Sequence, residues 1–370
     1  MKEDNDIFKK FRDSFSKIDG HFHILEQRVP VERQMEYFKY SEKIRKDQDK
    51  PDISKMDFSV FEDSLDDPES TVEHKKYVLS ILATSRQVKA YRILEEYAQA
   101  PDPDVADWAY MALMESRIAL ESELSDEKQI YISTGLGGKG EKLRFYVLIL
   151  ANELKPFLEY QKKVIEREFP YSLEKAGCEI ERLTIGEKCM ELVFLIPVRA
   201  DIKQALDKVI NECNQYGNFL SQVFTITNVK ELSAEEVEEI IKRMEETVKQ
   251  AIKYGIVGVS NTVITAVVIW IMMKLFGCSD VVSNMVGYVA GVLNSFIWNK
   301  QWTFRSSAGW IGSAVRFGVV FGVCYLLQLG LLVYVLNPYL SIDPYYNQLI
   351  AMAFYTVINF IMNKFYTFKA

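Results

Sequence analysis

Acidic residues are nearly absent from the last third of this sequence. Residues 251–370 include seven Lys or Arg and only two acids, Asp280 and Asp343, whereas residues 1–250 include 37 Lys or Arg and 49 acids. The formal net charge of −7 is therefore about −12 in the first part and +5 in the second. We expect the two parts to lie in different environments.

Cysteine and histidine are also scarce. The five cysteines are scattered, odd in number and without a C-x-x-C pair, which favours reduced thiols over a disulfide or zinc framework. His21 and His23 would lie on one face of a strand, but only one other histidine is present, and metal sites usually need more ligands. We predict no metal, no cofactor and, since no catalytic cluster is apparent, no enzyme activity.

The start of the chain lacks the apolar segment of a signal peptide. Residues 1–13 are strongly charged, so nothing in them directs the first part across a membrane, and we expect that part to stay in the cytosol. Its acidic balance also disfavours nucleic acid as a partner.

Four long runs without charge follow residue 253. They cover residues 254–273, 281–299, 317–342 and 344–363, and each has about the 20 residues that a helix needs to cross a bilayer. Basic residues flank the runs on one predicted side, and only Lys274 lies on the other, which places both termini inside the cell. The residues on the inner side are Lys253, Lys300, Arg305, Arg316, Lys364 and Lys369.

The membrane part contains an internal repeat. Residues 296–304 (FIWNKQWTF) end the second run, residues 360–368 (FIMNKFYTF) end the fourth, and they are identical at six of nine positions. The starts also match, with Lys253-Tyr254-Gly255 against Arg316-Phe317-Gly318. Because each copy has two spans, the copies share one topology, and we predict an all-α four-helix bundle built from two parallel helical hairpins. Duplication for packing alone is the alternative.

These residues resemble the GtrA-like family of small four-helix membrane proteins. The resemblance rests on the basic-aromatic-glycine opening, on Asn261-Thr262 in the first span and on the duplicated ending, and it covers about residues 250–369. That family often has an acid shortly after the Asn-Thr pair, where this chain has Thr265 or its neighbours. The resemblance implies translocation of a polyprenyl-phosphate-linked sugar, or of its lipid carrier, across the bacterial inner membrane in cell-surface polysaccharide synthesis.

Such a ligand needs a polar route for its head group and a cationic place for its phosphate. Uncharged polar residues in the spans are costly to expose to lipid, so they either line a groove or bond the helices to one another. The predicted groove residues are Asn261, Thr262, Thr265, Asn284, Asn294, Gln328 and Asn359. The predicted phosphate contacts are Lys253, Asn299, Lys300, Arg316, Asn363 and Lys364. The positive-inside bias alone also explains the basic residues among them.

The first part of the chain reads as several modules. We predict a helical or irregular segment over 1–60, a HEAT-like helical module over 61–127, a ferredoxin-like α+β domain over 128–232, a linker helix over 233–252 and the transmembrane domain over 253–370. Within the helical module we predict helices over 71–84, 86–98 and 105–122, and from Arg144 onward the order β-α-β-β-α-β, with its first helix over 156–167. Ser233 and Glu236 have the spacing of a capping box, and we expect the helix that they open to continue into the first span. Residues 135–140 match G-x-G-x-x-G, but a strand follows where a nucleotide site needs a helix, which favours a mobile hairpin loop over an anion contact.

Two functions fit these observations. The first is a translocator of a polyprenyl-phosphate glycolipid with a cytoplasmic interaction domain. The second is a membrane scaffold that recruits a glycosyltransferase to its lipid-linked substrate without transport. Because four helices enclose little volume, we also consider a homodimer.

Overall fold

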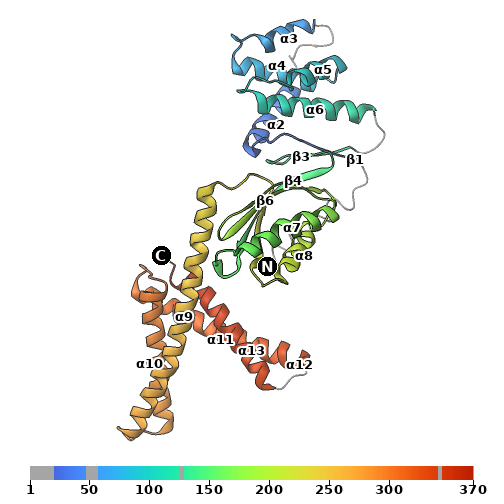
Figure 1. Cartoon of the computed structure of the whole chain (residues 1–370). Helices are drawn as coiled ribbons and strands as arrows, with labels where there is room; N and C mark the ends of the chain where they lie inside the picture. The colour runs from blue at the N-terminus through green and yellow to red at the C-terminus, as the bar shows by residue number, and fades with distance from the viewer. Residues whose placement is uncertain (1–20, 47–56, 125–128, 341–343, 370) are drawn as a thin grey trace. The chain divides into compact units, whose positions relative to one another are not determined.

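The computed structural model describes residues 21–46, 57–124, 129–340 and 344–369. The chain forms two compact units, Met1–Val237 and Glu238–Ala370. One helix, α9 (Ala234–Lys274), begins at the end of the first unit and continues as the first helix of the second (Figure 1). Residues 1–13, which carried the prediction about a signal peptide, lie outside the described residues.

The first unit opens with a helical module. Its core contains the fully buried side chains of Leu79, Leu82, Leu94 and Met111, with Trp108 donating a hydrogen bond from Nε1 to Ser80 Oγ over 2.9 Å. The predicted helices over 71–122 are present, each shifted by one or two residues. The helices are α2 (Val31–Lys46), α3 (Ser59–Asp66), α4 (Val72–Thr84), α5 (Val88–Tyr97) and α6 (Ala106–Leu124).

A five-stranded antiparallel sheet follows, and β4 lies at its centre. β4 pairs with β6 along one side, and with β3 and β7 along the other, so that the four long strands lie in the order β7-β4-β6-β5. The strands are β3 (Gly138–Lys139), β4 (Lys142–Ala151), β5 (Glu179–Ile185), β6 (Cys189–Pro197) and β7 (Leu220–Thr227). A separate parallel pair joins β1 (His21–Ile24) to β2 (Gln129–Ile132).

Two helices supply the core against this sheet: α7 (Glu159–Lys175) and α8 (Ile202–Asn214). From β4 to β7 the element order is the predicted β-α-β-β-α-β. The sequence predicted that α7 would end near Arg167, ahead of Pro170, but it continues to Lys175. Phe169 and Leu173 are fully buried beyond that point, so packing on the sheet offsets the backbone hydrogen bond that the proline removes.

The glycine loop over residues 135–140 is packed where an open hairpin loop was predicted. A Cβ at Gly135 would lie 1.8 Å from the carbonyl oxygen of Val229. Gly137 has φ +69°, and a Cβ there would lie within 2.9 Å of three carbonyl oxygens, those of residues 25–27. The backbone of neighbouring segments therefore occupies the space that an anion would need at this end of the loop.

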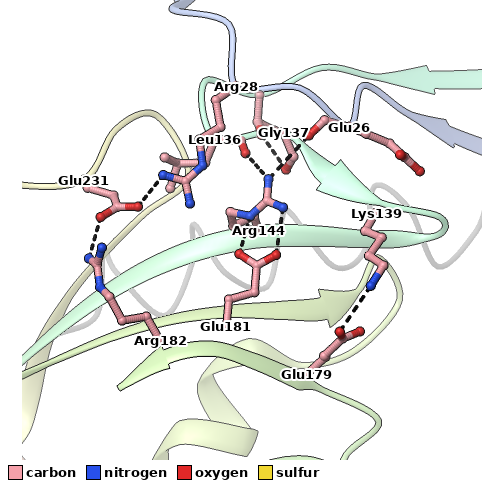
Figure 2. Close-up of polar contacts among 11 residues, drawn as sticks. Glu26, Arg28, Leu136, Gly137, Lys139, Arg144, Glu179, Glu181, Arg182 and Glu231 are labelled. Atoms are coloured by element: carbon pink, nitrogen blue, oxygen red, sulfur yellow. Dashed lines mark hydrogen bonds and ion pairs between the residues drawn. The ribbon is translucent and has the colours of Figure 1, made fainter. Parts of the chain in front are cut away.

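Ion pairs fasten this loop to the sheet (Figure 2). Arg144 on β4 makes a two-pronged pair with Glu181 on β5, with N–O distances of 2.5 and 2.8 Å, and its other terminal nitrogen donates to Leu136 O over 2.6 Å. The Arg144 hydrogen bonds lower the pKa of the Glu181 carboxyl. Arg144 therefore joins two strands and the glycine loop, as Figure 2 shows.

A second ionic cluster lies just before α9 begins. Glu231 accepts from both Arg28 and Arg182, each over 2.5 Å (Figure 2). Two residues later, Ser233 and Glu236 form the predicted capping box, because the Ser233 amide donates to the Glu236 side chain over 2.9 Å and the Glu236 amide donates to Ser233 Oγ over 3.3 Å. The first turn of α9 is therefore well defined by local contacts.

The second unit contains four helices that are long and apolar enough to cross a membrane. The predicted continuation of the charged helix after Ser233 into the first span is confirmed, since α9 runs for 41 residues without a break. The other long helices among the described residues are α10 (Asp280–Trp298), α11 (Trp310–Leu331) and α13 (Pro344–Met362), with the short α12 (Asn337–Tyr339) before α13. The chain is thus a membrane protein with a soluble portion of helices and sheets.

Candidate functional site

The duplicated sequence motif folds in the same way at both of its positions. α10 and α13 each end in a five-residue π-helical turn, η3 (Asn299–Thr303) and η5 (Asn363–Thr367). The amide of Phe304 donates to Asn299 O over 2.9 Å, and that of Phe368 donates to Asn363 O over 3.0 Å. Wide turns of this kind are rare in helices and frequent at functional sites.

Aromatic rings bring the four long helices together beside these turns. The rings of Phe304 and Phe368 stack at 5.2 Å, and each also contacts rings from the spanning helices at 5.8–6.1 Å. All six members fall in pairs of matching motif positions: Tyr254 with Phe317, Phe296 with Phe360, and Phe304 with Phe368. The cluster fixes one end of the membrane unit by edge and offset ring packing.

The motif asparagines and threonines are buried beside this aromatic cluster. Asn299 is 1% exposed and Asn363 is fully buried, and their amide nitrogens donate to Ser295 Oγ over 3.2 Å and to Asn359 Oδ1 over 2.6 Å. The Oδ1 atoms of both asparagines, and the Oγ1 atoms of Thr303 and Thr367, have no hydrogen-bond partner among the described residues. Buried polar atoms seldom stay unpaired in proteins, so these four indicate a place where water or a ligand binds.

The motif lysines lie in two different environments. Lys300 is 3% exposed, donates from Nζ to Ala308 O and to Ser313 Oγ, and lies 5.4 Å from the centre of the Trp310 ring. Lys364 donates to Thr247 Oγ1 over 2.6 Å. Lys300 is therefore occupied with the loop that leads into α11, although its sequence position matches that of Lys364.

The basic residues that open the two hairpins make matching contacts. Lys253 Nζ lies 3.4 Å from Trp302 O, and the Arg316 guanidinium donates to Tyr366 O over 3.2 Å. Trp302 and Tyr366 are corresponding positions of the duplicated motif. Each cation thus ties the first long helix of its hairpin to the π turn that ends the second.

A cavity of about 730 Å³ lies among the four long helices. Four of the predicted groove residues, Asn261, Thr262, Thr265 and Asn359, line it, as does Asn299. No acidic or basic side chain is among the described residues that line it. The groove can therefore donate hydrogen bonds to hydroxyl groups and accept them from hydroxyl groups, but it offers no carboxylate, histidine or lysine for proton transfer and no charge for an anion.

Three predicted groove residues lie outside the cavity lining. Asn294 Nδ2 donates to Asn261 Oδ1 over 2.8 Å, so Asn294 orients a lining side chain without lining the cavity itself. Asn284 is exposed on α10, and Gln328 is half-buried on α11. The sequence does not distinguish these positions from the lining ones, because all seven are uncharged polar residues within apolar runs.

Three tyrosines that the sequence analysis missed also line the cavity. They are Tyr254, Tyr288 and Tyr355. A tyrosine in a membrane helix is usually interpreted as aromatic packing or as part of the aromatic belt at the membrane interface. The available signal was the hydroxyl group, which needs a partner when buried; Asn359 Nδ2 donates to Tyr355 Oη over 3.1 Å.

Glycines set the wall of the groove between α9 and α10. A Cβ at Gly287 would lie 2.5 Å from the Ile269 side chain and 3.0 Å from Thr265 O, and a Cβ at Gly291 would lie 2.4 Å from Thr265 Oγ1. Two glycines four residues apart allow close approach of membrane helices, which gain packing and polar contact where the hydrophobic effect is absent. Thr265 reaches the groove because of this spacing.

A metal centre has no support from the described residues. No group of three or more His, Cys, Asp or Glu side chains among them could hold a metal ion. His23 instead stacks on Tyr131 with ring centres 4.7 Å apart, and its Nε2 lies 3.3 Å from Glu121 Oε2.

Comparison with known proteins bears on the membrane unit alone. Residues 253–368 match the GtrA/DPMS transmembrane domain. An uncharacterized membrane protein of Bacillus subtilis (strain 168), YngA, is 31% identical over 96 residues, covering 23% of this chain and 63% of that protein. The alignment thus spans less than two thirds of that relative. The C-terminal third of this chain is a GtrA/DPMS transmembrane domain, as the motifs indicated.

Proposed function

We propose that the membrane unit moves a polyprenyl-phosphate-linked sugar, or its lipid carrier, between the two leaflets of a bilayer. The observation that carries this proposal is the uncharged polar groove among four apolar helices. Amide and hydroxyl groups can replace the water around a sugar head group, while the surrounding apolar surface suits an isoprenoid chain. Membership of residues 253–368 in the GtrA/DPMS transmembrane domain is consistent with handling such glycolipids.

The groove favours passive or gradient-driven movement of the ligand. A proton-coupled pump needs an acidic or basic side chain inside the membrane that titrates near neutral pH, and the described lining residues include no Asp, Glu, His, Lys or Arg. We therefore expect exchange to be independent of a pH gradient, with net direction set by supply and consumption of the glycolipid.

The duplicated contacts support the proposal of two parallel hairpins in one helical bundle. Matching π turns, matching aromatic pairs and the matching pair of cation-to-carbonyl contacts relate the α9–α10 hairpin to the α11–α13 hairpin. Sites of duplicated transporters tend to lie between the repeats, and the lining of the groove comes from both hairpins.

We place this domain in the bacterial inner membrane with both termini in the cytoplasm. The support is the distribution of basic residues, six of seven on one side of the spans, and the bacterial origin of the relative. The end that carries the π turns is then the cytoplasmic end.

The soluble unit supports a second candidate function, a scaffold that recruits a glycosyltransferase. We propose that its helical module is HEAT-like and its sheet domain ferredoxin-like, a reading that the strand order β7-β4-β6-β5 favours. Modules of these kinds commonly bind proteins, and Glu231 and the capping box define the point where the sheet domain leads into α9.

A leaflet-exchange assay separates these two functions. The full chain would be placed in liposomes with a fluorescent short-chain polyprenyl-phosphate sugar, and exchange would be measured by quenching the outer leaflet. Asn359→Leu, which fills the groove with an apolar side chain, is expected to slow exchange about tenfold, whereas Asn284→Leu on the exposed face of α10 is expected to leave it unchanged. Exchange no faster than in empty vesicles would reject translocation and favour the scaffold.

A further inference from the structure

A second cavity, of about 390 Å³, lies at the end of the membrane unit that carries the π turns. It is formed where the charged part of α9 passes the residues at and just after η3. Its lining is polar and ionic, in contrast to the uncharged groove. The side chains used below are those of Glu246, Lys249, Gln250, Lys253, Thr303 and Arg305.

Positive charge dominates this cavity. Three cations line it against one carboxylate, that of Glu246. Lys249 has an exposed ion pair with Glu245 at 3.8 Å, a distance at which the attraction is weak in water, and Arg305 makes no ion pair within the described chain. The Lys253 ammonium lies 5.2 Å from the centre of the Trp302 ring and donates to Trp302 O over 3.4 Å, and an ammonium group has three donors in all.

Two buried polar atoms in this cavity have no partner. Thr303 is 2% exposed, and its Oγ1 has no hydrogen-bond partner among the described residues. Gln250 Oε1 is also buried and has no hydrogen-bond partner among the described residues. Exchanging the oxygen and nitrogen of the Gln250 amide would present an N–H group to the cavity, since the two atoms are assigned from their surroundings. A hydroxyl, an amide and three cations then converge on one space.

This set of donors suits a phosphoryl group. A phosphoryl group has several oxygens that accept charge-assisted hydrogen bonds from different directions, and an arginine and two lysines from two chain segments supply them. The net charge of the lining is +2, which balances a phosphate monoester such as the free lipid carrier, whereas the phosphodiester of a lipid-linked sugar carries a single negative charge. A carboxylate ligand, which has two oxygens, would leave part of the donor set unused.

The cationic cavity adjoins the groove. Lys253 lines the cavity, and the next residue, Tyr254, lines the groove. At the two ends of η3, Thr303 lines the cavity and Asn299 lines the groove. The phosphate of a lipid-linked sugar could therefore rest in the cavity while its head group enters the groove. By contrast, Lys300 already donates to Ala308 O and Ser313 Oγ.

We propose that the cavity of Lys249, Lys253, Thr303 and Arg305 binds the phosphoryl group of the lipid-linked ligand at the π-turn end of the groove. This inference rests on the proposed function for its choice of a lipid as the source of the phosphate. It keeps Lys253 from the predicted phosphate contacts and replaces the repeated Asn-Lys pairs with Lys249, Thr303 and Arg305, all on the side of the first hairpin.

Binding in nanodiscs tests this site. The full chain would be placed in phosphatidylcholine nanodiscs and titrated with a short-chain polyprenyl phosphate, with the matching polyprenol and with inorganic phosphate. The account predicts that polyprenyl phosphate binds at least about tenfold more tightly than polyprenol, and that Arg305→Gln and Thr303→Val each weaken it several-fold to about tenfold. Glu246→Gln is expected to tighten it, because the repelling carboxylate is removed.

Matched controls come from the repeat itself. Thr367→Val removes the corresponding buried, unpaired hydroxyl from the second π turn, which lies outside this cavity, and is expected to bind as wild type does. Lys274→Gln removes one positive charge at the opposite end of α9 and is likewise expected to leave binding unchanged. Thr303→Val and Thr367→Val thus make the same chemical change in two places.

Three outcomes would overturn the proposal. In the first, Arg305→Gln and Thr303→Val bind polyprenyl phosphate as tightly as wild type does, while Lys364→Gln binds it more weakly. That result would assign the phosphate site to the repeated Asn-Lys pair. In the second, inorganic phosphate binds as tightly as polyprenyl phosphate, which assigns the cavity to a soluble phosphate ligand. In the third, polyprenol binds equally well. Leaflet exchange by the wild-type chain is scored separately, so that loss of this site and loss of translocation are distinguished.

Discussion

At the scale of single residues, the chain places its ionic contacts where chain segments meet. Arg144 joins β4, β5 and the glycine loop through one guanidinium group, and Glu231 joins two arginines just before α9 begins. The Arg144–Glu181 pair is partly buried, in contrast to exposed helix pairs such as Arg243 with Glu239. Partly buried charge pairs depend on having both partners present, so removal of Arg144 should lower the stability of the soluble unit.

Replacing Arg144 is expected to destabilise the soluble unit. Arg144→Gln removes a two-pronged pair and the hydrogen bond to Leu136 O, which we estimate at about 1–3 kcal/mol of unfolding free energy. Arg243→Gln removes an exposed pair and should change stability by less than about 1 kcal/mol. Thermal unfolding of the soluble unit within the detergent-solubilised full chain, followed by far-ultraviolet circular dichroism, measures both. Equal shifts would contradict the role given to Arg144.

The same pair predicts a pH dependence. The pKa of Glu181 is lowered by its hydrogen bonds to Arg144, so this carboxylate adds stability above the ordinary carboxyl range and loses that contribution as the pH falls through its folded pKa. Wild type should therefore lose stability on acidification more steeply than Arg144→Gln. Parallel curves of melting temperature between about pH 3 and pH 7 would show that Glu181 does not carry this linkage.

The type and order of the helices and strands could be predicted from the sequence, but the surroundings of individual side chains could be predicted less well. The spans could be predicted because 18 or more apolar residues leave few alternatives to a membrane helix. β4 and β6 could be predicted as short apolar runs, and β5 by its alternation of apolar and polar residues. The burial of Lys300 depends on the loop around Ala308 folding back onto it, and the cavity around Arg305 depends on two segments about 50 residues apart in the sequence. Neither contact has a local signature in the sequence.

Close packing of α9 on α10 gives an element-scale prediction. Gly287→Ala would place a Cβ 3.0 Å from Thr265 O and 2.5 Å from Ile269, and overpacking of this kind costs about 1–3 kcal/mol. Gly318→Ala on α11 meets open space and should be neutral or slightly stabilising. The measurement is the temperature at which each purified variant loses its monodisperse peak in size-exclusion chromatography. If both variants lose the peak at a similarly lowered temperature, the effect comes from alanine in a helix interior in general and not from the contact between α9 and α10.

The glycine loop gives a second prediction at this scale. Gly137→Ala would force a Cβ within 2.9 Å of three backbone carbonyl oxygens at a positive φ, whereas Gly140→Ala has a positive φ but open surroundings. We expect Gly137→Ala to prevent folding of the soluble unit and Gly140→Ala to cost only about 1 kcal/mol. Limited proteolysis of the two variants in membranes checks this, and equal resistance to protease would contradict the packed loop.

In the whole molecule, one helix, α9, begins in the soluble unit and continues into the membrane unit. The membrane part could be located from the sequence because it contains almost no acidic residues. The repeat could be identified because the two endings share Asn, Lys and Phe at matching positions. Four of the groove residues could be found by their polarity, but the sequence could not separate them from Asn284 or Gln328. Which polar residues line a groove depends on helix rotation, and apolar runs fix that rotation poorly.

The most direct measurement blocks the groove during exchange. In a full-length chain with Cys278 and Cys324 replaced by serine, Thr265→Cys would be labelled with a bulky thiol reagent in proteoliposomes, with Asn284→Cys as the matched control. The account predicts that label at residue 265, in the groove wall, abolishes leaflet exchange of a polyprenyl-phosphate sugar, while equal labelling at residue 284 leaves it intact. Undiminished exchange after complete labelling of residue 265 would contradict the central claim that the head group passes through this groove.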